Sequence, residues 1–120
     1  MKTILIADDT ATGRELVRDV LEKKGYRVLE AADGNEAIHQ ARAARPDLTL
    51  LDLHMPGRDG FGVLEELRQS AELAATPIVA LTASAMQGDR ERAMSAGFTA
   101  YFAKPLRLAT LKSEIERLLS

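Results

Sequence analysis

The chain has 120 residues, and a composition of 46% hydrophobic but only 4% aromatic residues predicts one core built mainly from Leu, Val, Ile and Ala. Its 16 basic and 18 acidic residues leave a net charge of -2, which argues against direct nucleic-acid binding, because such surfaces need clustered Lys and Arg. The sequence contains no cysteine, so disulfides, thiolate chemistry and the usual structural zinc sites are excluded, in keeping with a cytoplasmic location.

The N-terminal part predicts a strand and a helix and no targeting segment. The apolar run at residues 4–7 is too short for a signal peptide and far too short to cross a bilayer, so we expect no membrane contact. A helical apolar face follows this strand, and Thr12 with Glu15 has capping-box spacing near its start. Gly25 stands where a left-handed cap would end the helix.

The next unit repeats this order. Residues 28–29 predict a short second strand, and Asp33 with Glu36 forms another capping box at the start of a second helix. Pro46 stops that helix. Residues 48–51 then predict a third strand, which is apolar on both faces.

The remaining sequence predicts three helices and two strands in alternation. A helix is expected over residues 60–69, and Pro77 opens a fourth strand. A further helix over roughly residues 88–96, a fifth strand that reaches Phe102 and a closing amphipathic helix at residues 108–119 complete the series.

Five β-α units with short connections predict a parallel sheet covered by helices on both faces, because right-handed crossovers place helices on the sheet. The expected fold class is therefore a three-layer, doubly wound α/β domain. No linker or repeat interrupts the pattern, so we expect one domain over residues 1–120.

Four of the predicted strands end on residues able to handle a metal ion or a phosphoryl group. These residues are, in chain order, Asp8 with Asp9, then Asp52, Thr82 and Lys104. The carboxyl ends of parallel strands lie along one sheet edge, where open α/β sheets place their sites. We therefore expect three carboxylates, a hydroxyl and an ammonium to converge.

Each of these residues has an ordinary explanation when taken alone. Asp52 could cap a turn, Thr82 could begin a helix, and Lys104 could be a solvated loop residue whose bond to Pro105 is a candidate cis peptide. Their joint order at successive strand ends is what favours a site. Adjacent carboxylates repel each other, and a divalent cation such as magnesium, which prefers oxygen ligands, would relieve that repulsion.

With its full set of motifs the chain resembles the receiver domain of two-component response regulators, from Met1 to Ser120. The motifs are Asp8-Asp9, Asp52 followed by Met55-Pro56 and Asp59-Gly60, Thr82-Ala83, and Tyr101 three residues before Lys104-Pro105. The resemblance implies a flavodoxin-like fold of five parallel strands in the order 2-1-3-4-5.

The resemblance also implies a phosphoacceptor and a magnesium site. Asp52 would accept a phosphoryl group from a histidine kinase or a phosphotransfer protein. Asp9 would bind Mg²⁺ directly and Asp8 largely through water, while Asp52 and the backbone carbonyl of His54 would complete the protein ligands. His54 and Ser84 occupy positions that influence in the family how fast water removes the phosphoryl group.

Further residues are implied to carry the switch. Lys104 would pair with the phosphoryl oxygens, and Thr82 would hydrogen-bond the attached group beside the Ala83 N–H. The Tyr101 ring would then turn inward and shift the face formed by the fourth helix, fifth strand and fifth helix. The first-helix positions Arg14 and Arg18, expected to be exposed, could set the choice of kinase or simply form a solvated face.

The expected function is a phosphorylation-dependent switch without an attached effector, which catalyses only its own phosphorylation and dephosphorylation and docks onto a downstream protein. We expect a monomer before phosphorylation. A receiver module excised from a hybrid kinase or multidomain transcriptional regulator is an alternative: Met1 favours a complete protein, and Ser120 is compatible with truncation.

Two other classes fit less well. An aspartyl-nucleophile phosphatase generally carries a second Asp two residues after the nucleophile, and His54 stands there. A flavodoxin-like cofactor binder needs a Gly-rich or hydroxyl-rich phosphate loop, which the sequence lacks.

Overall fold

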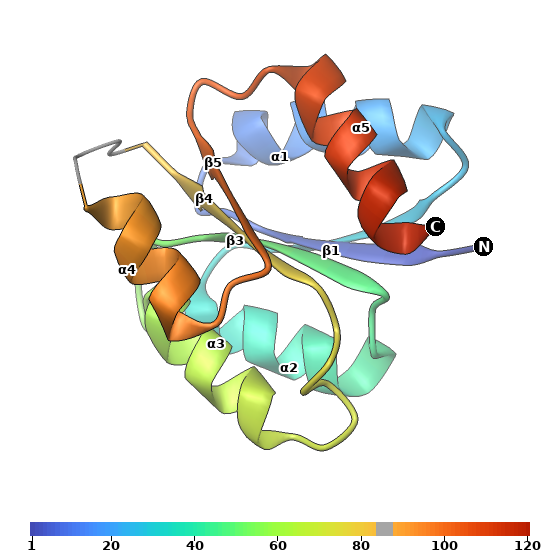
Figure 1. Cartoon of the computed structure of the whole chain (residues 1–120). Coiled ribbons are helices and arrows are strands. Elements are labelled where there is room, and N and C mark those ends of the chain that lie inside the picture. The colour runs from blue at the N-terminus through green and yellow to red at the C-terminus, as the bar shows by residue number, and fades with distance from the viewer. Residues whose placement is uncertain (84–87) are drawn as a thin grey trace.

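The structure is a computed structural model that describes residues 1–83 and 88–120, and Ser84 therefore lies outside the described residues. Five strands alternate with five helices along this part of the chain (Figure 1). In chain order the elements are β1 (Thr3–Ala7), α1 (Ala11–Lys23), β2 (Arg27–Ala31), α2 (Gly34–Ala44), β3 (Leu48–Asp52), α3 (Gly60–Gln69), β4 (Ile78–Thr82), α4 (Asp89–Ala96), β5 (Ala100–Ala103) and α5 (Leu108–Leu119).

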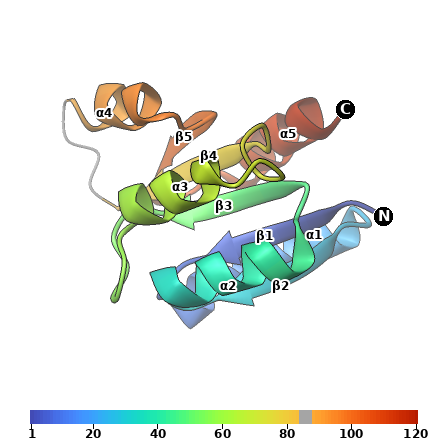
Figure 2. The same cartoon turned by 90° about the horizontal axis from the view of Figure 1, so that it is seen from below.

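The strands form one parallel sheet in the order β2-β1-β3-β4-β5, which confirms the expected topology. Helices α1 and α5 cover one face of the sheet, and α2, α3 and α4 lie on the other (Figure 1). Figure 2 shows α2 and α3 in front of the sheet, with the strand arrows pointing the same way. Every residue of β3 and β4 is buried, as expected for central strands covered on both faces.

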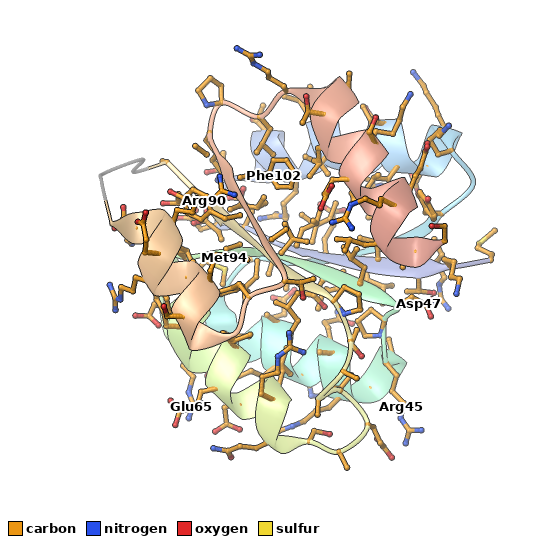
Figure 3. The ribbon with its side chains drawn as sticks, viewed as in Figure 1. Arg45, Asp47, Glu65, Arg90, Met94 and Phe102 are labelled. Atoms are coloured by element: carbon orange, nitrogen blue, oxygen red, sulfur yellow. The ribbon has the colours of Figure 1, made fainter. Side chains whose placement is uncertain are left out.

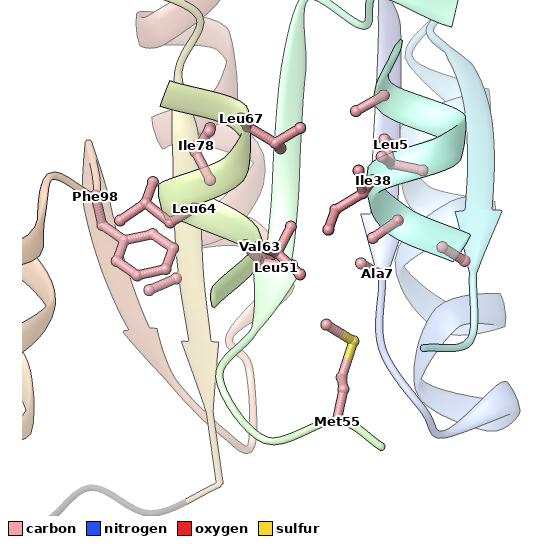
Figure 4. Close-up of a cluster of buried hydrophobic side chains, with 14 of the residues drawn as sticks. Leu5, Ala7, Ile38, Leu51, Met55, Val63, Leu64, Leu67, Ile78 and Phe98 are labelled. Atoms are coloured by element: carbon pink, nitrogen blue, oxygen red, sulfur yellow. The ribbon is translucent and has the colours of Figure 1, made fainter. Parts of the chain in front are cut away.

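Two core clusters follow from the alternation of side chains along each strand. In β1, Leu5 and Ala7 pack toward α2 and α3, whereas Ile4 and Ile6 pack toward α1 and α5. Figure 4 shows the first cluster, where Met55, from the loop after β3, joins the buried side chains of α2 and α3. This packing ties the loop that follows Asp52 to the core.

Several predicted helix ends are confirmed. The Asp33 side chain accepts a hydrogen bond from the Glu36 N–H at 2.8 Å, as a capping residue should. Gly97, directly after the end of α4, and Gly25, two residues after the end of α1, adopt left-handed conformations with φ of 116° and 93°. The Lys104-Pro105 bond is cis.

The capping box predicted at Thr12 is wrong. Helix α1 begins at Ala11, and Thr10 is the N-cap residue, although its side chain makes no capping hydrogen bond. The Thr10 N–H instead donates to Asp8 Oδ1 at 2.8 Å. The start of α1 is therefore set by Asp8, the residue that follows β1, and not by a cap at Thr12.

Within residues 1–83 and 88–120, no helix combines the length and hydropathy needed to cross a membrane.

Candidate functional site

The sheet register brings the ends of the central strands to one edge. Ala7 pairs with Leu51, and Asp52, one residue further along β3, pairs with Leu81. Thr82, the last residue of β4, pairs with Ala103 on β5. The residues that follow these strand ends, Asp8 and Lys104, consequently approach Asp52 from both sides.

Three carboxylates meet at this edge, at Asp8, Asp9 and Asp52. Each offers one oxygen, and these oxygens all lie within 4.8 Å of one another. Asp8 and Asp52 are only 3% and 4% exposed, whereas Asp9 is open to solvent. We call these residues the acidic cluster. Burial of two like charges so close together needs compensation from a cation.

Lys104 supplies part of that compensation. Its Nζ donates to Asp8 Oδ2 at 2.6 Å and to Asp52 Oδ2 at 2.8 Å, so one ammonium from the end of β5 joins the ends of β1 and β3. Burial acts to lower the pKa of Lys104, but the hydrogen bonds and charges of Asp52 and Asp8 outweigh burial and raise it. Lys104 is therefore held as a cation.

The loop after β3 positions Asp52. The backbone N–H of the exposed residue His54 donates to Asp52 Oδ1 at 2.9 Å, and the Gly60 N–H donates to the Leu53 carbonyl at 3.0 Å. A Cβ atom on Gly60 would stand 2.7 Å from the Asp52 carbonyl oxygen, so only glycine permits this close approach. The metal role expected for the His54 carbonyl stays a prediction.

Asp8 is fixed through three further atoms besides the oxygen that Lys104 binds. Its backbone N–H donates to the Ala31 carbonyl at 3.0 Å, and its Oδ1 accepts from the Thr10 N–H. Its carbonyl oxygen accepts from Arg14 Nη1 at 2.5 Å. The Arg14 side chain is only 16% exposed, so the expectation of an exposed position is wrong for Arg14.

The residues expected to act as a switch lie at and after the end of β4 and on β5. Thr82 is fully buried, and its carbonyl accepts from the Lys104 backbone N–H at 2.7 Å. Ala83 follows it and is exposed. Tyr101 is half-buried and packs against the first core cluster; burial is the main cause that raises the pKa of its hydroxyl.

A groove of about 300 Å³ opens next to Asp8 and Lys104, between the start of α1 and the β5–α5 connection. Leu16 lines this groove and is 57% exposed. Gly13 also lines it, and a Cβ atom there would stand 3.3 Å from Asp8 Oδ2. The groove gives access to the acidic cluster from the side of α1.

The fold and the site together define a receiver domain. The chain belongs to the response regulator receiver domain family of two-component signalling proteins, whose family model matches residues 4–116. Such chains are signalling domains rather than classical enzymes.

Individual relatives support the same assignment. The polar-differentiation response regulator DivK of Brucella anthropi is 38% identical over 116 residues, which cover 93% of this chain and 94% of that protein. The solved structure of the chemotaxis protein CheY4 of Vibrio cholerae is 33% identical, with a TM-score of 0.92 and coverage of 99% of both chains. The receiver domain of the sensor histidine kinase PA1611 of Pseudomonas aeruginosa, solved with a coordinated magnesium ion in its active-site cleft, is 36% identical. It has a TM-score of 0.90 over 98% of this chain and 97% of that one.

Proposed function

We propose that the protein is a phosphorylation-dependent switch in which Asp52 accepts a phosphoryl group from a histidine kinase or a phosphotransfer protein. The observation that supports this role best is the buried Asp52 carboxylate, held by Lys104 inside the acidic cluster. A carboxylate that is 4% exposed carries a desolvation cost even when Lys104 and the His54 N–H hold it, and functional sites tolerate such a cost.

We propose that the acidic cluster holds Mg²⁺, through Asp8, Asp9, Asp52 and the His54 carbonyl. The donor set fits this ion, because the three carboxylates offer hard oxygens within 4.8 Å of one another. The magnesium ion in the PA1611 receiver domain supports the same choice. When bound, Mg²⁺ offsets charge on the oxygens of a transferring phosphoryl group.

The protein side chains supply the remaining chemistry. An oxygen of Asp52 forms a bond to phosphorus while the P–N bond of the donor phosphohistidine breaks and its imidazole keeps the electron pair. Lys104 lies 2.8 Å from Asp52 Oδ2 and can pair with the incoming phosphoryl oxygens. The His54 N–H keeps Asp52 Oδ1 in place at 2.9 Å.

Phosphorylation adds about two negative charges and strong acceptor oxygens next to the end of β4. Thr82 and the Ala83 N–H are the groups expected to bind them, and Tyr101 is expected to transmit the change. The face that would change lies over α4, β5 and α5, where Arg90, Met94 and Phe102 border one groove (Figure 3). A downstream protein would bind this face.

The proposed switch is a single receiver domain over residues 1–120, which acts in the cytoplasm and is a monomer before phosphorylation. It catalyses only its own phosphorylation and dephosphorylation, and it contacts proteins rather than nucleic acid or membrane. The net charge of -2 supports the absence of a nucleic-acid surface.

The test is to incubate the protein with Mg²⁺ and acetyl phosphate and to locate the modified residue by mass spectrometry. We expect one labile acyl phosphate on Asp52, which is absent in Asp52→Asn. Asp59→Asn is the matched control, because Asn keeps the oxygen that caps α3 at the Gly62 N–H. No modification, or a stable ester on a hydroxyl, would contradict the proposal. Steady hydrolysis of a small phosphoester would indicate a phosphatase instead.

A further inference from the structure

Arg14 links the acidic cluster to the neighbouring strand β2. Its Nη1 donates to the Asp8 carbonyl at 2.5 Å, and its Nε donates to Glu30 Oε1 at 3.1 Å. The guanidinium is rigid and planar, so two bonds from different nitrogens fix its orientation as well as its position. With its side chain 16% exposed, Arg14 is held against the protein rather than in solvent.

The carbonyl that Arg14 binds belongs to the peptide between Asp8 and Asp9. A peptide group is planar, so holding its oxygen fixes the plane that joins two of the three acidic-cluster residues. The Asp8 N–H is held at the same time by the Ala31 carbonyl, at 3.0 Å. With the peptide free to rotate, the Asp9 carboxylate would lose its fixed direction relative to Asp8. Asp9 is the exposed member of the cluster and therefore depends most on this restraint.

Glu30 holds Arg14 in turn. Its Oε1 pairs with Arg14 Nε, and its Oε2 pairs with Arg18 Nη1 at 2.9 Å. Arg18 also pairs with Glu22 at 3.1 Å, and no described hydrogen bond joins Arg18 to the acidic cluster. Arg14 and Arg18 thus share one carboxylate and one helix, but only Arg14 reaches the Asp8 peptide.

We propose that Arg14, braced by Glu30, is a positioning residue that holds the Asp8–Asp9 peptide in the orientation needed for magnesium binding. This inference rests on the proposed function, because it concerns the same metal site. In this proposal α1, which carries Arg14, and β2, which carries Glu30, help to shape the acidic cluster, although the carboxylates themselves come from the ends of β1 and β3.

The charge of Arg14 and its proposed positioning role have opposite effects on magnesium affinity. The direction in which the affinity changes when Arg14 is removed therefore distinguishes them. Arg14 carries a positive charge near the carboxylates, and this charge repels a divalent cation bound there. Removal of Arg14 would therefore tighten magnesium binding if only charge mattered. If positioning dominates, the same removal weakens binding, because the ligands are no longer held ready.

The experiment is a calorimetric titration of Mg²⁺ into the full chain and into Arg14→Gln. We expect the dissociation constant to rise roughly tenfold, the low end of what the loss of a group that orients a metal ligand costs. The Mg²⁺ concentration that gives half-maximal phosphorylation by acetyl phosphate should rise by the same factor, with a much smaller change in the rate at saturation. Arg18→Gln is the matched control and should bind Mg²⁺ like the parent.

Glu30→Ala provides a second variant that leaves Arg14 in place without its brace. We expect a smaller loss of affinity, and the double variant with Arg14→Gln should be no worse than Arg14→Gln alone, because both changes act through one interaction. Thermal unfolding of each variant checks that the fold is retained. Affinity losses that simply add would overturn the role of Glu30.

Different outcomes of the titration would contradict the positioning role of Arg14 and the metal site itself. Unchanged or tighter Mg²⁺ binding by Arg14→Gln would overturn the positioning role and leave the metal site intact. Absence of Mg²⁺ binding by the parent chain would overturn the proposed metal site, and the positioning role with it.

Discussion

Lys104 balances two carboxylates that would otherwise face each other in a buried site. Its ammonium lies within 2.8 Å of Asp8 and Asp52, and its side chain is 23% exposed. Removal of one partner from a buried ionic group leaves an uncompensated charge, which is costlier than the pair itself is worth. Lys104 is therefore expected to contribute to stability as well as to phosphoryl binding.

Lys104→Met should lower the free energy of unfolding by about 1–2 kcal/mol at neutral pH in a chelator, less than for a fully buried pair because solvent reaches Lys104. The folded-state pKa of Lys104 is raised above its ordinary value of 10.5. Its contribution is therefore fully present below that value and is lost as the pH rises through the folded-state pKa. Urea unfolding of parent and variant should show a constant difference near neutral pH that shrinks above pH 10.5. A difference that grows in alkali would contradict this assignment.

Thr82→Ala tests the coupling between the phosphoryl group and the distant face. We expect the variant to accept a phosphoryl group at Asp52, because its carboxylates and Lys104 are unchanged. The response of Tyr101 should fall to less than half of that in the parent, because the hydroxyl expected to follow the phosphoryl oxygens is missing.

The measurement is the NMR shift of the Tyr101 ring when beryllofluoride, a mimic of the phosphoryl group, is added with Mg²⁺. Ser113→Ala, at an exposed position on α5, is the control. An equal shift in parent and Thr82→Ala would show that the hydroxyl does not transmit the change.

The sequence predicted that the strand-end residues lie together, because parallel strands finish at one edge of the sheet. Asp8, Asp9, Asp52 and Lys104 are brought together as expected. The contact of Arg14 with the Asp8 carbonyl was missed, because it depends on how α1 docks beside β2 and leaves no local sequence signal.

Among the elements, α3 is tied to the segments that follow it by one side chain. Arg68, near the end of α3, donates from Nη1 to the carbonyls of Leu73, Ala74 and Thr76 at 3.3, 3.0 and 2.7 Å. Its Nη2 donates to the Gly97 carbonyl at 3.1 Å, at the end of α4. Arg68 thereby joins the α3–β4 connection to the C-terminal end of α4.

Arg68→Ala should destabilise the protein by about 2–3 kcal/mol, because several carbonyls lose a charged donor at once. Arg68→Lys should recover less than half of this loss, since a single ammonium cannot reach both groups of acceptors. Urea unfolding measures the stability of both Arg68 variants. Arg90→Ala, at an exposed position on α4, is the control, and its free energy of unfolding is expected within about 0.5 kcal/mol of the parent value. Full recovery by Lys would show that charge alone matters.

A second contact holds α4 against α3. The Arg92 guanidinium lies 4.1 Å from the centre of the Phe61 ring, and Phe61 meets Phe98 edge to face with ring centres 5.8 Å apart. Only Ala93 of α4 is buried among its described residues, so these contacts and the Arg68 bond provide much of its attachment.

Element boundaries were predictable where the signal is local. The helix ends marked by Gly25, Gly97 and the Asp33 cap were predictable from the sequence, because a left-handed residue or a capping oxygen acts within one turn. Thr12 had the right spacing for a cap and still lies inside α1, because the hydrogen bond from Thr10 to Asp8 starts the helix earlier. One local hydrogen bond thus overrode another local pattern.

For the molecule as a whole, the alternation of strands and helices predicted the three layers from the sequence. The order of the strands was not derivable from periodicity, since all five runs are apolar and any neighbour would satisfy them. The order 2-1-3-4-5 came from the resemblance and is confirmed by the pairing of β1 between β2 and β3.

Chelation should abolish phosphorylation without unfolding the chain. The two core clusters contain none of the proposed metal ligands. The circular dichroism spectrum of the protein in excess EDTA should therefore match its spectrum in Mg²⁺. Phosphorylation by acetyl phosphate should be lost, because the negative acidic cluster then repels the donor. Millimolar Mg²⁺ should restore it and raise the melting temperature. Unimpaired phosphorylation in EDTA would contradict the metal requirement.

The ion pair between Lys104 and Asp8 joins residues 96 positions apart in the chain. During synthesis the N-terminal strands leave the ribosome first. A nascent polypeptide can present its aspartates long before the lysine that balances them has been translated. In the proposed mechanism, competence to receive a phosphoryl group therefore arises only after Lys104 has left the ribosome, and the order of synthesis itself keeps shorter nascent chains from responding.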